Sequence, residues 1–299
     1  MQNTGRVSAL QVFKMSERKT IRPVTLRRVI EVSDLAIKAK RIDTAIVSKE
    51  LGVSLSRAKE IILELEIMGL LTRLDNSHVP GNKTEEFLKY FENDQWDKIH
   101  EYFLANYRFY QDFIRILQAN INNSKGLALA EIKEASVKGE LSLNQTAVEV
   151  LSDWSERLEV VQRHLFTRRL YLIIIGNADH KIFKDALLKY HREFSVSNRR
   201  RGIFLEIPTL REDLCEKLKV SRKVFDEMLR STFLENVGRI ELSGAPIITL
   251  AKKSPLSEKR MKLEGKDAIL SPKFEAVKER EGLSVGQKAY YYLAIHDSI

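Results

Sequence analysis

The sequence predicts a mainly α-helical protein with short β-hairpins, and three observations lead to this fold class. Apolar residues recur at three- and four-residue spacing through most of the 299-residue chain, as they do in amphipathic helices. Two segments, residues 44–71 and 203–250, each contain two such helical patterns, separated by a three-residue break and followed by a strand-like run. Between them, residues 84–122 carry ten aromatic residues at mostly helical spacing, which indicates a helical middle.

The composition is that of a folded protein, and it excludes several classes. Hydrophobic residues make up 43% and charged residues 30% of the chain, which is unlike a disordered sequence. The longest apolar run, residues 170–175, is far shorter than the roughly 20 residues that span a bilayer. The first residues lack the pattern of a secretion signal, so we expect a cytoplasmic protein that does not enter a membrane. The one cysteine, Cys215, excludes an intramolecular disulfide, and its place on an apolar helix face predicts a buried thiol.

Residues 23–83 carry the most specific pattern in the chain. A first helix is expected over residues 23–40, followed by two shorter helices and a strand. Gly52 permits a positive φ in the break between the shorter helices. Ser54 or Ser56 can cap the helix that follows, and Gly69 ends it before the strand.

This pattern, with Ala45 in the first short helix, a Leu-Gly-Val-Ser break and a Gly-Leu-Leu end, resembles the helix-turn-helix of winged-helix transcription regulators. The resemblance covers residues 44–71. In that family the second helix of the motif enters the DNA major groove, with its N-terminal residues facing the bases. It implies that the groove is contacted by Ser54, Ser56, Arg57 and Lys59, with Glu60 beside them, and that phosphates are contacted by Arg73, His78 and Lys83 of the strand and wing.

Residues 179–252 are expected to form a second module of the same type. Thr209 and Glu212 have the spacing of a capping box, Ser221 can cap the next helix, and residues 238–242 and 247–250 are expected to pair as a hairpin. Its groove candidates are Arg222 and Lys223. However, Asp226 and Glu227 follow them and the wing tip at residues 243–246 has no cation, which favours a protein contact or a structural role for this module.

The regions between and around these modules have weaker patterns. Residues 84–126 are expected to be a helical connector whose aromatic residues form a core rather than a stacking platform for unpaired bases. Residues 127–178 resemble a third, less regular winged-helix module, with a capping box at Ser142 and Gln145. Residues 253–299 are expected to be a basic linker with a helix at 272–280 and a docking segment around residues 290–293.

Positive charge exceeds negative charge in the chain. The net charge is +9, and residues 1–22 are expected to be a mobile basic arm, although Met15 could serve as a second start. Such an excess attracts polyanions without giving sequence specificity. The densest cationic point, which is a candidate phosphate contact or a solvated loop, consists of Arg199, Arg200 and Arg201.

No pattern in the sequence indicates an active site. The six histidines and Cys215 share no metal-ligand spacing, and no phosphate-binding loop, dinucleotide fingerprint or nucleophile elbow occurs. We therefore expect a protein without enzymatic activity, cofactor or metal.

Together these patterns predict a double-stranded DNA-binding transcription regulator, in which pairing of half-sites by a homodimer is plausible. The alternative is an interaction scaffold, in which module 179–252 and the C-terminal segment bind protein subunits of a larger nucleic-acid-processing assembly (transcription, repair or defence).

Overall fold

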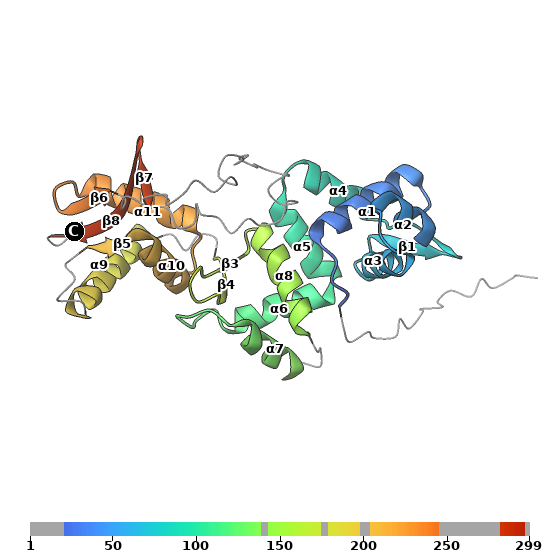
Figure 1. The fold of residues 1–299 in the computed structure, drawn as a ribbon, viewed down its shortest axis with the longest axis horizontal. Helices are drawn as coiled ribbons and strands as arrows, with labels where there is room; N and C mark the ends of the chain where they lie inside the picture. The colour runs from blue at the N-terminus through green and yellow to red at the C-terminus, as the bar shows by residue number, and fades with distance from the viewer. Residues whose placement is uncertain (1–20, 139–142, 175–178, 198–203, 245–281, 297–299) are drawn as a thin grey trace, which may run out of the picture.

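The computed structural model describes residues 21–138, 143–174, 179–197, 204–244 and 282–296. Helices make up 59% of these residues and the strands form short antiparallel pairs, which confirms the mainly α prediction. The described chain is elongated, and two hydrophobic cores lie along it (Figure 1). One core is built from residues between Ile21 and Leu172, and the other from residues between Tyr171 and Ile295. No helix in these ranges is long and apolar enough to cross a membrane.

The first repeat of helices and strands, which we call unit 1, runs from residue 26 to residue 80. It contains α1 (Leu26–Ala39), α2 (Thr44–Leu51), α3 (Leu55–Ile67), β1 (Leu71–Leu74) and β2 (Ser77–Pro80). A single bridge joins Ile42, which lies between α1 and α2, to His78 in β2. Gly52 adopts the expected left-handed conformation, with φ of 62°. Ala45 is exposed near the start of α2, whereas Val47 lies in the core.

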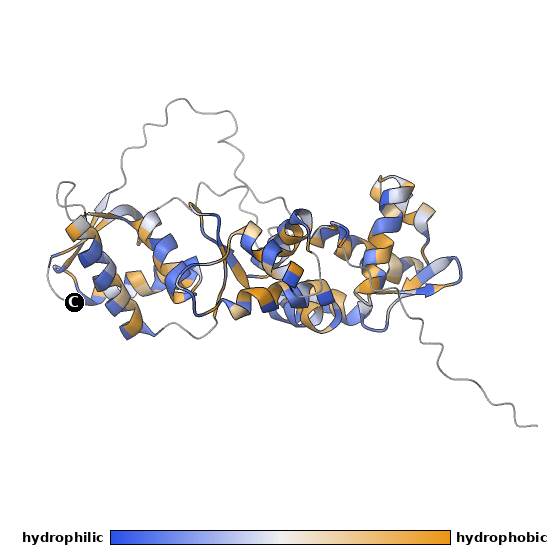
Figure 2. Cartoon of the chain, turned by 90° about the horizontal axis from the view of Figure 1, so that it is seen from below, coloured by the Kyte–Doolittle hydropathy of each residue, from blue (hydrophilic) through white to orange (hydrophobic). Residues whose placement is uncertain are grey.

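The helical middle follows unit 1 and contains α4 (Thr84–Glu92), α5 (Trp96–Asn106) and α6 (Arg108–Ala119). The aromatic residues here form a core, as predicted. Phe103 has no exposed surface and its ring lies 5.1 Å from that of Trp154, measured between centroids. Figure 2 shows hydrophobic and hydrophilic residues alternating along these helices, as expected for helices with one buried face.

Unit 2 begins with α6 and continues through residue 172. Its other elements are α7 (Leu129–Lys138), α8 (Gln145–Arg157), β3 (Val161–Arg163) and β4 (Leu170–Leu172). A bridge joins Leu127 to Leu170 in β4. The side chain of Asn144 accepts a hydrogen bond from the Ala147 N–H at 2.8 Å, so Asn144 caps α8. The predicted cap, Ser142, lies outside the described residues.

Unit 3 comprises α9 (His180–Ser197), β5 (Leu205–Glu206), α10 (Ile207–Leu218), α11 (Arg222–Glu235), β6 (Ile240–Gly244), β7 (Leu283–Val285) and β8 (Lys288–Ile295). Its sheet has the order β5-β8-β6, and β7 also pairs with β8. The predicted docking segment therefore lies in β8, where Leu293 pairs with both Leu205 and Leu242 and has no exposed surface. The strand expected at 247–250 and the helix expected at 272–280 lie outside the described residues.

The predicted capping box at the start of α10 does not form. The helix begins at Ile207, with Pro208 in its first turn and no side-chain cap. Thr209 donates its hydroxyl to Glu206, and Glu212 is fully buried in an ion pair instead of capping the helix. In contrast, Ser221 caps α11 as predicted, because its hydroxyl accepts from the Val224 N–H at 3.3 Å.

The three units share one order of elements. In each, a helix is followed by a strand or single bridge residue, two helices and two antiparallel strands. The isolated bridge or strand always pairs with the later strand of the pair: Ile42 with β2, Leu127 with β4, and β5 with β8. One arrangement therefore occurs three times in the described chain, with α4 and α5 between units 1 and 2 and an additional strand, β7, in unit 3.

Candidate nucleic-acid interface

The N-terminal turn of α3 is exposed and held in place by local hydrogen bonds. Gly52 turns the chain out of α2, and the Ser54 hydroxyl accepts from the Arg57 N–H at 3.3 Å, which caps α3. The side chains that this turn presents to solvent are those of Ser54, Leu55, Ser56 and Lys59. Three of the four groove residues predicted on this helix end, Ser54, Ser56 and Lys59, therefore lie together on one exposed turn.

The fourth predicted groove residue, Arg57, is turned back toward its own unit. Its guanidinium donates to the Glu60 carboxylate at 2.8 Å and to the backbone carbonyl of Pro23, just before unit 1. The side chain is about one-third exposed, at 35%. In this arrangement Arg57 is neutralised by an acid and does not project from the helix as a bidentate base contact would require.

The strand pair of unit 1 carries one exposed predicted phosphate residue and one that is largely buried. Arg73 in β1 is exposed, and its Nε lies 3.4 Å from the Asp75 carbonyl oxygen. The His78 side chain is only 13% exposed, and its Nε2 lies 3.4 Å from the Glu66 carboxylate. His78 is therefore poorly placed for phosphate, because its ring faces α3 and an acid. Lys83 is exposed just before α4.

In unit 3 the corresponding helix end is occupied by protein. The Arg222 guanidinium donates to the Glu212 carboxylate at 2.5 and 2.8 Å and to the Arg163 carbonyl at 2.7 Å. The Arg222 N–H donates to the side chain of Gln162 at 3.1 Å. The β3–β4 hairpin of unit 2 thus lies against the N-terminus of α11, and Arg222 is engaged within the molecule. Lys223, its neighbour, is exposed.

The same contact region between units 2 and 3 is extensive and polar. It includes hydrogen bonds from the Leu165 N–H to Glu212 at 2.7 Å, from the Gly126 N–H to Glu216 at 2.8 Å, and from the Ile174 N–H to the Lys219 carbonyl at 2.7 Å. Because buried polar groups are costly unless they are paired, these bonds hold the two units in one arrangement.

The N-terminal end of α8 in unit 2 is exposed but has a different charge. Its exposed residues are Asn144, Gln145, Thr146 and Glu149, so an acid and no cation lies on this turn. Farther along α8, the indole N–H of Trp154 donates to the Val24 carbonyl at 3.1 Å, which ties this helix to the chain segment before unit 1. Of the N-terminal ends of α3, α8 and α11, that of α3 therefore has the most favourable charge for DNA.

Most of the excess of positive over negative charge comes from residues outside the described ranges. The described ranges contain 34 Lys and Arg against 32 Asp and Glu, whereas the whole chain contains 50 against 41. Arg199, Arg200 and Arg201 also lie outside the described residues, as do residues 1–20. The structure therefore does not place these predicted phosphate contacts relative to α3.

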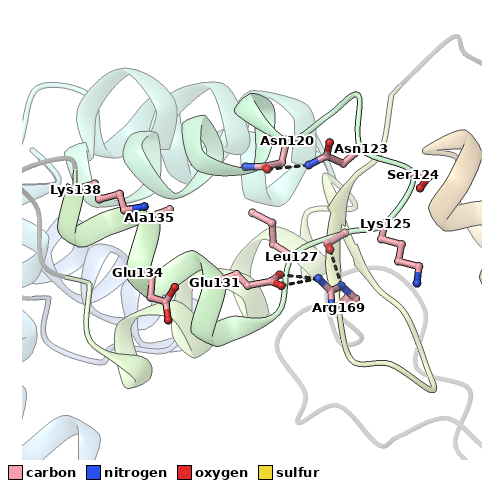
Figure 3. Close-up of a pocket in the computed structure, with 11 residues that line it drawn as sticks. Asn120, Asn123, Ser124, Lys125, Leu127, Glu131, Glu134, Ala135, Lys138 and Arg169 are labelled. Carbon is pink, nitrogen blue, oxygen red and sulfur yellow. Dashed lines mark hydrogen bonds and ion pairs between the residues drawn. The ribbon is translucent and has the colours of Figure 1, made fainter.

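An open pocket of about 490 Å³ lies in unit 2, between the end of α6, the chain leading to Leu127, and α7. On one side of it Arg169 and Glu131 point toward one another and form an ion pair at 2.7 Å; on the other side Asn123 donates to Asn120 (Figure 3). A hydrogen bond from the Ala128 N–H and the Arg169 guanidinium lower the pKa of Glu131 below its usual value. The polar side chains that make these bonds already have partners within the protein, and no nucleophile with an adjacent base lies among the lining residues.

The described ranges hold all six histidines and the one cysteine of the chain. These ranges contain no group of three or more His, Cys, Asp or Glu side chains placed to hold a metal ion. Cys215 is fully buried, as predicted, and burial raises the pKa of its thiol, which disfavours the reactive thiolate.

The sequence matches no protein-family model, and no curated protein is significantly similar to it.

Proposed function

We propose that the three units are winged-helix modules and that the protein is a non-enzymatic, double-stranded DNA-binding regulator that contacts DNA through unit 1. The repeated order of elements supports the first part. In all three units the two central helices precede a strand pair, and the isolated bridge or strand pairs with the later strand. Helix-turn-helix proteins use the second of these helices to read the major groove.

The observation that carries the proposal is the exposed first turn of α3. Ser56 and Lys59 project from it, and the one acid beside them, Glu60, is paired with Arg57. Arg73 on the adjacent strand pair offers a cation for the sugar-phosphate backbone. The other two units support a framework role, because the end of α11 is covered by the β3–β4 hairpin and the end of α8 carries Glu149.

The charge of unit 1 differs from that of the segments outside the described ranges. Unit 1 and its flanking residues, 23–83, are nearly balanced in charge, with ten Lys or Arg against eight Asp or Glu. Residues 1–20, 198–203 and 245–281 together carry 16 Lys or Arg against seven Asp or Glu. These basic segments would supply the salt-dependent attraction to phosphate, and α3 would supply base contacts.

One observation favours the alternative, a scaffold subunit of a larger nucleic-acid-processing assembly. Leu55, at the tip of α3, is 60% exposed, and Ile46 and Leu74 of the same unit are also exposed. Exposed apolar side chains on one unit suit a protein partner as well as a base edge. The DNA proposal is favoured because Ser56 and Lys59 flank Leu55, and both can hydrogen-bond to bases or phosphates.

Fluorescence anisotropy of the full-length protein tests the proposal. Labelled random duplex of about 30 base pairs and single strand of the same length are titrated at salt concentrations from about 50 to 300 mM. We expect duplex to bind more tightly and the logarithm of the association constant to fall steeply with the logarithm of the salt concentration. Absence of duplex binding at the lowest salt would refute the proposal and favour the scaffold.

A further inference from the structure

Leu55 occupies an unusual position for an apolar residue. It is the first residue of α3, it lies between Ser54 and Ser56, and 60% of it is exposed. Its neighbours on the exposed turn are hydroxyl groups and the Lys59 ammonium. An apolar side chain at the tip of a helix that is otherwise polar on its exposed side is not needed for the core of unit 1.

The charged residue that would be expected to read a base is directed elsewhere. Arg57 donates to Glu60 and to the Pro23 carbonyl, so its guanidinium is not available for the O6 and N7 acceptors of guanine in this arrangement. The Ser54 hydroxyl already accepts from the Arg57 N–H as the helix cap. Leu55 is therefore the largest uncharged side chain that the turn presents.

Among the four bases, thymine alone presents an apolar group in the major groove, its C5-methyl, and apolar side chains contact it there. We propose that Leu55 is a specificity-determining residue that packs against a thymine C5-methyl group, so that unit 1 selects a thymine-containing site. The inference rests on the proposed function, because it assigns a base to the helix end that the proposal places in the groove. The Ser56 hydroxyl, next to Leu55, can donate a hydrogen bond to a neighbouring base or accept one from it.

The test removes the methyl group and nothing else. The full-length protein first selects its preferred duplex from a random pool, and each thymine of that duplex is then replaced by deoxyuridine. Deoxyuridine keeps base pairing and phosphate charge but lacks the methyl. Burial of one methyl is worth about 0.8 kcal/mol, so binding should weaken roughly four-fold at one or two positions.

Two variants identify the side chain responsible. Leu55→Ala should bind the thymine and deoxyuridine duplexes equally, because it cannot reach the methyl. The matched control is Leu74→Ala, which removes a leucine of 46% exposure from the strand pair of the same unit and should keep the full discrimination. Thermal unfolding by circular dichroism checks that both variants are folded. The comparison of thymine and deoxyuridine duplexes with the wild-type protein needs neither variant.

Failure of the Leu55 contact and failure of the proposed DNA binding give different outcomes. If a duplex is selected but deoxyuridine has no effect at any position, or if Leu55→Ala keeps the discrimination, the inference is wrong and DNA binding stands. If no duplex is selected and none is bound, the proposed function fails and the inference fails with it.

Discussion

Arg222 and Glu212 form a charged pair inside the contact between units 2 and 3. The Arg222 guanidinium donates two hydrogen bonds to the Glu212 carboxylate, whose side chain has no exposed surface, and a third to the Arg163 carbonyl. The cation that the sequence suggested for a DNA groove thus binds an acid and a neighbouring hairpin. These bonds hold the Arg222 guanidinium within the molecule, between α10 and the β3–β4 hairpin.

Glu212→Gln should destabilise unit 3. The substitution keeps the size of the side chain but leaves the mostly buried Arg222 without its counter-charge, and breaking one partner of a buried ion pair costs about 3 kcal/mol. Urea unfolding followed by far-ultraviolet circular dichroism measures the loss. Glu227→Gln, which removes an exposed acid from α11, is the control and should change the stability by less than about 0.5 kcal/mol. Equal stability of the two variants would contradict the importance of the pair.

Lys219→Met should stabilise the protein at neutral pH. Lys219 is 5% exposed, and its Nζ has no hydrogen-bond partner, although it lies 5.5 Å from the centroid of the Tyr171 ring. Burial lowers the pKa of its ammonium despite the nearby Glu216. Replacing an unsatisfied buried charge with an apolar side chain of similar length should add about 1–3 kcal/mol. The left-handed backbone at residue 219, with φ of 57°, is shared by both side chains and cancels in the comparison.

The pH dependence of stability provides a second measurement on Lys219. Because its folded pKa is lower than its unfolded pKa, the unfolded chain binds more protons between the two values. The wild-type free energy of unfolding should therefore rise with pH from the lowered folded value up to about 10.4, and this rise should be smaller in Lys219→Met. A variant that is less stable than the wild type at every pH would mean that the cation–π contact with Tyr171 outweighs the cost of burying the ammonium.

The features of unit 1 that were predicted correctly are local in sequence. Gly52 and Ser54 act within four residues of their own positions, and their roles follow from backbone conformation and helix capping. The aromatic core of α4 to α6 follows from helical spacing, since residues three and four apart share a face. Such features can be predicted from one sequence because they depend on short-range geometry.

The features that were missed depend on partners distant in sequence. Glu212 has the spacing of a capping residue, but its carboxylate is buried against Arg222 and the Leu165 N–H. The pairing of Leu205 with Leu293 joins residues far apart in the chain, and strand patterns do not specify their partners. Likewise, the pattern of α3 places Arg57 at the surface without indicating that it bonds to Pro23.

Asp213 should make the contact between units 2 and 3 sensitive to acid. Burial alone would raise the pKa of Asp213, but hydrogen bonds from His164 and Tyr190 outweigh it and hold the pKa below its usual value. Nδ1 of His164 accepts from the Phe166 and Thr167 N–H groups, so its Nε2 donates to Asp213.

The sign of this effect follows from the lowered pKa. A carboxylate with a depressed folded pKa contributes stability above its unfolded pKa of about 3.9, and that contribution is lost as pH falls through the folded value. Asp213→Asn should therefore be less stable than the wild type at pH near 7, and the difference should shrink below pH of about 4. Asp185→Asn, which removes an exposed acid from α9, is the control and should show no such convergence. A difference that stays constant with pH would show that the charge of Asp213 is not the cause.

Lys59 and Arg57 should affect DNA binding in different ways, although only Ala58 lies between them on α3. Lys59 is exposed, so Lys59→Ala should weaken binding to all duplexes and reduce the magnitude of the salt slope by about 0.9 if it contacts one phosphate. Arg57 is paired with Glu60, so the double variant Arg57→Ala/Glu60→Ala keeps the net charge of unit 1 and should bind with nearly unchanged affinity and salt slope. Anisotropy titrations over the same salt range measure both. If the double variant instead lost about 1–3 kcal/mol of discrimination between the selected duplex and random duplex, Arg57 would leave Pro23 on binding and contact a base, as the resemblance implied.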